Sequence, residues 1–256
     1  MAACGPQPQE ISRVALVAPF EGRYREVGYN ALYAARLAFQ DRGRSEIELL
    51  AIDDGGTVET AVDRAHALAQ DPLVKAVVVL GYAATAAETQ QAFGDLPVLV
   101  AGQWGTKPET ENVLLLANPV LADIITAPSR VEITDVARLK TPLVGGEVFG
   151  LEQFTALEGP LAGIMIVSSG SLPEAAFRER YRASGPFTPE PNLVTTLTYQ
   201  ALRMVLESNM GSRADISRSL SAHFQAGYWT DAPVNTYRYD TACVERGGEM
   251  CLVAAD

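Results

Sequence analysis

The chain has 256 residues, of which 48% are hydrophobic and 20% charged, a balance that is typical of globular proteins and excludes wholesale disorder. The net charge of −11 argues against a nucleic-acid partner, because phosphate contacts need a clustered basic face. With 2 histidines and 3 cysteines the chain has little material for a zinc site or a histidine-based triad, and its apolar runs are too short to span a bilayer.

The first residues predict a tether rather than part of the fold. Small residues precede Cys4, and a stretch rich in proline and glutamine follows it. This arrangement resembles the end of a bacterial lipoprotein signal, in which the cysteine carries the lipid and becomes the mature N-terminus. The resemblance implies that Cys4 is lipidated and that residues 1–10 form a tether. The alternative is an arbitrary leader with a stray cysteine.

The first part of the chain then alternates continuous apolar runs with amphipathic stretches. Strands are predicted at residues 13–19, 46–52, 75–80, 97–101 and 113–117. Helices are predicted at residues 28–40, 58–70 and 83–93, where small and apolar residues recur at helical spacing. Apolar runs without alternation indicate a parallel sheet covered by helices on both faces. Such sheets bind ligands in the crevice at the carboxyl ends of their strands.

A second set of elements follows Asn118 and Pro119. Strands are predicted at residues 123–127, 142–145 and 161–168. Helices are predicted at residues 132–139, 173–183, 193–206 and 214–223, and the ending at residues 233–254 reads as strands. The fold class is therefore α/β, with a second α/β part after the parallel sheet.

Two cysteines near the end predict a disulfide. Cys243 and Cys251 lie in β-type runs that flank a Gly-Gly pair, which indicates a hairpin. A loop over residues 246–248 would put Gly248 in the left-handed position and place the two cysteines directly opposite each other. A disulfide indicates an oxidising compartment, and with Cys4 as a lipid anchor no cysteine is left over. The alternative is a pair of buried free thiols.

The order of several short stretches resembles the type I periplasmic binding proteins, in particular the branched-chain amino acid binding family of ABC importers. The stretches that carry the resemblance are Ala18-Pro19 with Gly28, Gly81 with Thr85, Gly105-Thr106-Lys107-Pro108-Glu109, Pro142-Leu143-Val144-Gly145-Gly146-Glu147 and Thr198-Tyr199-Gln200-Ala201. Their order holds along nearly the whole chain. Family members are usually longer, with several βα units in the second lobe, so the resemblance implies a shortened second lobe here.

The resemblance also implies a division of the chain into two lobes. Residues 11–118 and 164–228 would form lobe 1, and residues 119–163 and 229–256 a reduced lobe 2. The lobes would close on a ligand about crossover strands near Asn118 and Leu161.

The family holds the charged head of an amino acid between its lobes, where a buried carboxylate needs donors and an ammonium needs an acceptor. By resemblance Thr85 supplies a hydroxyl, Thr106 and the backbone of Gly105 grip the head group, and Glu147 faces the ammonium. Each has a structural alternative. Thr85 would cap the next helix, Thr106 would be a turn residue, and Glu147 would begin a solvated helix.

Four further residues are candidates for the ligand site. Trp104 stands where the family has a small residue, so it either fills the pocket or stacks on a ligand. Tyr24 is near the position of an aromatic residue in the first loop, and Tyr82 follows the third strand. Arg130 replaces a lid aromatic, and with Arg23 it favours a more anionic ligand. The alternative is that both arginines lie on the surface.

These observations predict an exported, lipid-anchored solute-binding protein that passes an amino acid or similar small polar molecule to an ABC permease. It would lie in the cell envelope and need no cofactor, metal or nucleic acid. The first alternative is a shortened family member that binds another envelope protein or acts in sensing without transport. The second is an intracellular α/β enzyme, which is least favoured because neither a G-x-G-x-x-G nor a G-x-x-x-x-G-K-[ST] pattern is present.

Overall fold

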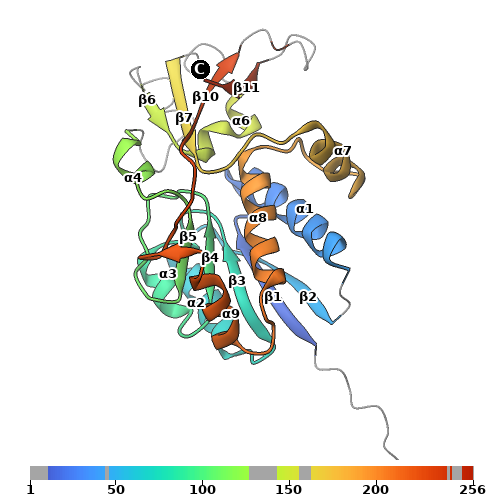
Figure 1. Cartoon of the computed structure of the whole chain (residues 1–256), viewed down its shortest axis with the longest axis vertical. Coiled ribbons are helices and arrows are strands. Elements are labelled where there is room, and N and C mark those ends of the chain that lie inside the picture. The colour runs from blue at the N-terminus through green and yellow to red at the C-terminus, as the bar shows by residue number, and fades with distance from the viewer. Residues whose placement is uncertain are drawn as a thin grey trace, which may run out of the picture.

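The computed structural model describes residues 11–43, 46–126, 143–155, 163–240, 243 and 250–255. Two sheets organise these residues, one of seven strands and one of four (Figure 1). We call the seven-stranded sheet with its covering helices the large lobe, and the four-stranded sheet with the short helices beside it the small lobe. In Figure 1 the small lobe lies above the large one.

The large sheet has the strand order β2-β1-β3-β4-β5-β9-β8. Its strands are β1 (Ser12–Ala18), β2 (Ile47–Asp53), β3 (Val74–Val79), β4 (Val98–Ala101), β5 (Val113–Leu116), β8 (Phe224–Gln225) and β9 (Tyr228–Trp229). The first five are parallel, β9 continues this direction, and β8 turns back antiparallel. Strands β4 and β5 are buried along their whole length, which confirms the predicted parallel sheet covered on both faces.

Five helices belong to the large lobe. They are α1 (Arg25–Arg42), α2 (Val58–Gln70), α3 (Ala87–Ala92), α8 (Leu193–Glu207) and α9 (Arg213–Ser221). Helices α1 and α8 pack side by side, whereas α2 packs with α3 (Figure 1). Small alanines on the buried face of α1, among them Ala31 and Ala35, allow its close approach to the sheet. Across the described part of the chain no helix combines the length and apolarity that crossing a membrane requires.

The small sheet has the strand order β11-β10-β7-β6. Its strands are β6 (Leu143–Gly145), β7 (Ile164–Ser168), β10 (Asn235–Asp240) and β11 (Cys251–Ala254). The 3-10 helix η1 (Glu147–Gly150) and helix α6 (Glu152–Thr155) follow β6, while α7 (Ala175–Ala183) follows β7. The buried core is continuous through both lobes and includes Leu193 of α8, Phe149 of η1 and Tyr239 of β10.

Three crossings between the lobes, all within the described residues, are hydrogen-bonded to one another. The N–H of Asn118 donates to Ser169 Oγ at 2.8 Å, and Asn118 Nδ2 donates to the carbonyl of Ala232 at 2.6 Å. Ser169 Oγ in turn donates to the carbonyl of Pro233 at 2.9 Å. These contacts connect the crossings. Asn118 was expected at a crossing, whereas Leu161, the other expected position, lies outside the described residues.

Two predicted features of the second half differ from the structure. Residues 123–127 were expected as a strand, but helix α4 (Leu121–Ile124) occupies this region because Asn118 Oδ1 accepts the N–H of Val120 and starts a turn. The lobe boundary expected at residue 164 also shifts, because β7 pairs with β6 and β10 in the small sheet. The helix expected at residues 132–139 lies outside the described residues.

The predicted disulfide is present, but the predicted hairpin register is wrong. Cys243 and Cys251 are bonded, with their Cα atoms 5.7 Å apart. Strand β10 pairs Asp240 with Cys251, whereas the predicted register would place Cys251 opposite Cys243. The buried face sets the pairing here, because Tyr237 and Tyr239 of β10 both point inward. Residues 246–248 of the predicted loop lie outside the described residues.

Candidate functional site

A hollow of about 330 Å³ lies where the two lobes meet. On the large-lobe side its walls come from the loops that follow β3 and β4, at the carboxyl ends of these parallel strands. On the small-lobe side they come from α4 and from the junction of β6 with η1. The described residues that line it are Tyr82, Gln103, Trp104, Gly105, Thr106, Lys107, Ala122, Ile125, Gly146, Val148 and Phe149.

Two glycines turn the chain out of the sheet and into this site. Gly81 follows β3 with φ +94°, and Gly102 follows β4 with φ +92°, both in a region that side chains strongly disfavour. A Cβ on Gly81 would come within 2.8 Å of Pro19 Cδ. Glycine at both positions therefore lets the two loops leave the sheet sharply and lie against each other.

Aromatic side chains form one wall of the hollow. The ring of Tyr82 makes edge contacts with Tyr24 at 5.4 Å and with Trp104 at 5.5 Å between centroids. Trp104 is 4% exposed, and its Nε1 donates to the carbonyl of Ala101 at 2.8 Å. Trp104 and Tyr82 thus line the hollow, and their contact with a ligand stays a prediction. Tyr24 lies behind Tyr82 and supports its ring instead of lining the hollow.

The two threonines belong to a structural network rather than to one open site. Thr85 is buried, and its hydroxyl donates to the carbonyl of Gly81 at 2.8 Å. Thr106 lines the hollow, but its hydroxyl donates to the carbonyl of Thr85 at 2.8 Å and accepts Gln90 Nε2 at 2.7 Å. Thr85 therefore does not face the hollow, and its contact with a ligand stays a prediction. Its hydroxyl hydrogen already has a buried acceptor, and the side chain does not line the hollow.

Glu147 also turns away from the hollow. Its neighbours Gly146 and Val148 line the cavity, but its own carboxylate points behind the wall. There Oε2 accepts the N–H of Gln103 at 3.1 Å and Oε1 accepts the hydroxyl of Ser168 at 2.8 Å. Removal from water raises the pKa of this carboxyl above its ordinary value. Glu147 therefore joins the two lobes, and its contact with a ligand ammonium stays a prediction.

Among the lining residues that the sequence analysis did not predict, two have polar side chains, Gln103 and Lys107. Gln103 is 7% exposed, and its Oε1 accepts the N–H of Gly105 at 3.1 Å. Lys107 is exposed and lies at the rim. The sequence did contain a signal for Gln103: it is a polar residue between Gly102 and Trp104, directly after an apolar strand. Binding groups of parallel sheets lie at this carboxyl end. The other predicted positions, Arg130 and Cys4, lie outside the described residues.

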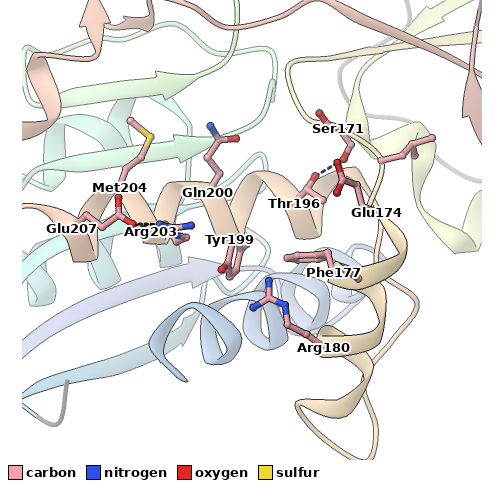
Figure 2. Close-up of a pocket in the computed structure, with 12 residues that line it drawn as sticks. Ser171, Glu174, Phe177, Arg180, Thr196, Tyr199, Gln200, Arg203, Met204 and Glu207 are labelled. Atoms are coloured by element: carbon pink, nitrogen blue, oxygen red, sulfur yellow. Dashed lines mark hydrogen bonds and ion pairs between the residues drawn. The ribbon is translucent and has the colours of Figure 1, made fainter. Parts of the chain in front are cut away.

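A larger hollow, of about 600 Å³, lies on the outside of the molecule between α7 and α8 (Figure 2). Phe177 and Arg180 of α7 lie across from Tyr199 and Arg203 of α8 in this view. Its arginines already have partners, because Arg203 pairs with Glu207 and Arg180 Nη1 lies 2.8 Å from Asp41 Oδ2. This hollow is remote from the carboxyl ends of β3 and β4, so the interlobe hollow is the better candidate site.

Neither the protein-family models nor the curated proteins give a match to this chain. Solved structures do match. A possible leucine/isoleucine/valine-binding protein from Rhodopirellula baltica aligns with a TM-score of 0.67 at 14% identity, covering 99% of this chain and 98% of that one.

Two further structures match over similar lengths. The branched-chain amino acid transporter substrate-binding protein from Streptococcus pneumoniae, solved with isoleucine, gives a TM-score of 0.68 at 14% identity, covering 96% of this chain and 100% of that one. A fatty acid ABC transporter substrate-binding protein from Thermomonospora curvata gives 0.71 at 13% identity, covering 96% and 92%. At this level of identity the likeness concerns the fold. The two unequal lobes and the mostly parallel sheet with its covering helices therefore give this chain the fold of the type I periplasmic binding proteins.

Proposed function

We propose that the chain is an exported solute-binding protein that captures an amino acid or a similar small polar molecule and passes it to an ABC permease. The observation that carries the proposal is the hollow of about 330 Å³ between two lobes, at the carboxyl ends of β3 and β4. Its volume lies in the range of small-ligand sites. Solved proteins of the same fold support this assignment, because two are complexes with leucine or isoleucine and a third is a fatty acid ABC transporter substrate-binding protein.

The proposed mechanism is binding without chemistry on the ligand. A ligand in the hollow touches the large lobe through the loop of Trp104 and the small lobe through Val148, so its contacts favour the closed arrangement of the lobes. The three crossings joined by Asn118 and Ser169 supply the hinge. A permease that binds the closed form selectively would then recognise the protein with its ligand bound.

We place the protein in the cell envelope. The bond between Cys243 and Cys251 supports an oxidising compartment. Lipidation at Cys4 remains part of the proposal, and it would hold the chain on a membrane through the N-terminal tether. Labelling of the expressed full-length protein with a fatty-acid analogue tests this point. We expect label on wild-type protein and none on Cys4→Ser.

Ligand binding should stabilise the folded protein. At a free ligand concentration of about 100 Kd, linkage adds about 2.7 kcal/mol. For a chain of this size, that raises the Tm by roughly 5–10 °C. Thermal denaturation with a panel of amino acids and small carboxylic acids measures the effect. Intrinsic fluorescence gives a second signal, because Trp104 lines the hollow.

The variant Trp229→Phe is the matched control for fluorescence, because Trp229 lies in β9 and does not line the hollow. A fluorescence change on ligand addition should persist in Trp229→Phe and disappear in Trp104→Phe. A panel in which no compound shifts the Tm would contradict the proposed function.

A second candidate function is an envelope interaction protein that no longer transports a solute. Two features of the packing favour this alternative. Trp104 is buried, and the carboxylate of Glu147 points away from the hollow. Under this alternative Tm is unchanged throughout the ligand panel, and cross-linking in the native envelope joins the chain to a protein partner.

A further inference from the structure

One residue that lines the hollow has a buried hydrogen-bond donor without an acceptor among the described residues. Gln103 lines the hollow and is 7% exposed, and its Nε2 finds no hydrogen-bond partner in the described part of the chain. The other end of the same amide is fixed, because Oε1 accepts the N–H of Gly105 at 3.1 Å. The orientation of the amide is therefore determined, and Nε2 is left as the group to be satisfied. A buried donor without an acceptor is unfavourable, so a ligand acceptor that reaches Nε2 would be bound strongly.

A positive charge lies at the edge of the same hollow. Lys107 lines it and is exposed, and none of the described carboxylates forms an ion pair with its ammonium. The loop from Gln103 to Lys107 thus brings an amide donor and a cationic side chain to the border of one cavity. Both groups favour an acceptor that carries negative charge.

The described wall of the hollow has no negatively charged group that could bind a cationic ligand. None of its described side chains carries a carboxylate, and Glu147 directs both oxygens to Gln103 and Ser168 behind the wall. The hydroxyl of Thr106 is engaged with Thr85 and Gln90. An ammonium placed here would lose its hydration without a charged partner, which is strongly unfavourable.

Most of the remaining wall is apolar. The lining includes Trp104 and Tyr82 on the large-lobe side and Ile125, Val148 and Phe149 on the small-lobe side. This surface suits a hydrocarbon or aromatic body of a few carbons, whose burial is favourable in proportion to its area.

We propose that the hollow takes a small carboxylate with an apolar body and without a charged amino group, held at Gln103 Nε2 and steered by Lys107. This inference rests on the proposed function. It narrows the ligand class from amino acids to the corresponding acids that lack the amino group, such as short aliphatic or arylalkanoic acids.

Calorimetric titration of wild-type protein with matched pairs tests the proposal. The pairs are 4-methylpentanoate with leucine and 3-phenylpropanoate with phenylalanine, which share a skeleton and differ in the amino group. We expect at least one acid to bind at least tenfold more tightly than its amino acid. We also expect 4-methylpentanamide, which keeps an acceptor but no charge, to bind more weakly than the acid.

Variants then locate the contact. Gln103→Leu should weaken binding of the acid roughly tenfold to hundredfold, the range for a hydrogen bond to a charged group. Gln103→Glu keeps the shape of the side chain, so it tests the same donor if the leucine variant does not fold. The matched control is Gln153→Leu, because Gln153 also has a buried Nε2 without a partner among the described residues but does not line the hollow.

Lys107→Met should weaken binding of the acid a few-fold and reduce its dependence on salt, whereas Lys75→Met in β3 should change neither. Amino acids that bind as tightly as or more tightly than their matched acids would overturn the inference and uphold the proposed function. Binding of neither series would overturn both. Unchanged affinity of the acid in Gln103→Leu and Gln103→Glu would remove the site.

Discussion

Two glutamates join the lobes from opposite sides. Glu147 of the small lobe accepts the N–H of Gln103 in the large lobe at 3.1 Å. Glu26 of α1 in the large lobe accepts the N–H groups of Glu152 and Gln153 at the start of α6, the latter at 2.9 Å. Desolvation raises the pKa of both carboxyls above the ordinary value of 4.5, although the hydrogen bonds that they accept partly oppose it.

A raised pKa in the folded state makes the contribution of Glu147 to stability depend on pH. The folded protein holds this proton more tightly than the unfolded chain does. The contribution is therefore complete below about pH 4.5 and is lost as the pH rises through the raised pKa. We expect the Tm of the wild type to fall more steeply than that of Glu147→Gln as the pH is raised from about 4.5 toward neutrality.

Thermal denaturation of both proteins across this range measures the difference. The exposed Glu21→Gln is the control, because it removes one acidic residue without touching the lobe junction. Comparing the two variants cancels the general relief of repulsion that any loss of negative charge brings to a chain of net charge −11. Parallel curves for wild type and Glu147→Gln would show that this carboxyl does not couple stability to pH.

At the scale of elements, α8 is the helix that joins the lobes. It begins beside the small lobe at Leu193 and runs along α1 in the large lobe. Its first turn carries a reciprocal cap: Asn192 Oδ1 accepts the N–H of Val194 at 3.0 Å and of Thr195 at 3.2 Å. Thr195 Oγ1 accepts the N–H of Asn192 and donates to Asn30 Oδ1 of α1. The cap thus fixes both the start of α8 and its position on α1.

Removing this cap should destabilise the protein. We expect Asn192→Ala to cost about 1 kcal/mol, because two N–H groups of the first turn lose their acceptor. The corresponding fall in Tm is roughly 2–4 °C. Asn192→Asp keeps the acceptor oxygen and removes Nδ2, a buried donor without a partner among the described residues, so it should be at least as stable as the wild type. Denaturant unfolding of the three proteins measures this, and equal losses in both variants would refute the capping role.

At the scale of the whole molecule, the two lobes differ in how they are held together. The large lobe has a parallel sheet with helices and a deep apolar core. The small lobe has four strands, and its edge strand β11 begins at the bridged Cys251. Small sheets bury less apolar surface for their length, so a covalent link makes a larger relative contribution to their stability.

The disulfide should therefore contribute measurably to stability. The bridged residues are separated by 8 positions, and the chain-entropy relation gives about 2.5 kcal/mol for such a loop. We expect the double variant Cys243→Ser with Cys251→Ser to melt roughly 5–10 °C below the wild type. A reductant should lower the Tm of the wild type and leave that of the double variant unchanged. Cys4→Ser is the control, and a wild type insensitive to full reduction would contradict the prediction.

Much of the architecture follows from local patterns in the sequence. Helix α2 spans Val58–Gln70 as predicted, because its apolar positions recur at helical spacing and Thr57 accepts the N–H of Thr60 at its start. Strands β1 to β5 were predicted to within a residue or two, since buried parallel strands are continuous apolar runs, whereas the two-residue strands β8 and β9 were not predicted. The bridge between Cys243 and Cys251 was predicted from two cysteines at a turn.

The site depends on information that no local pattern carries. Glu147 meets the backbone of Gln103 across 44 positions, and whether its carboxylate enters the hollow or turns behind it depends on the packing of the lobes. The hydroxyl of Thr85 likewise does not face the hollow, because it donates to the carbonyl of Gly81, four residues earlier. Residue type and order determined the parallel sheet and the disulfide, because periodicity and turn chemistry act over a few residues. Only the tertiary structure decided which polar groups face the cavity, because each buried donor and acceptor takes the nearest partner that folding brings to it.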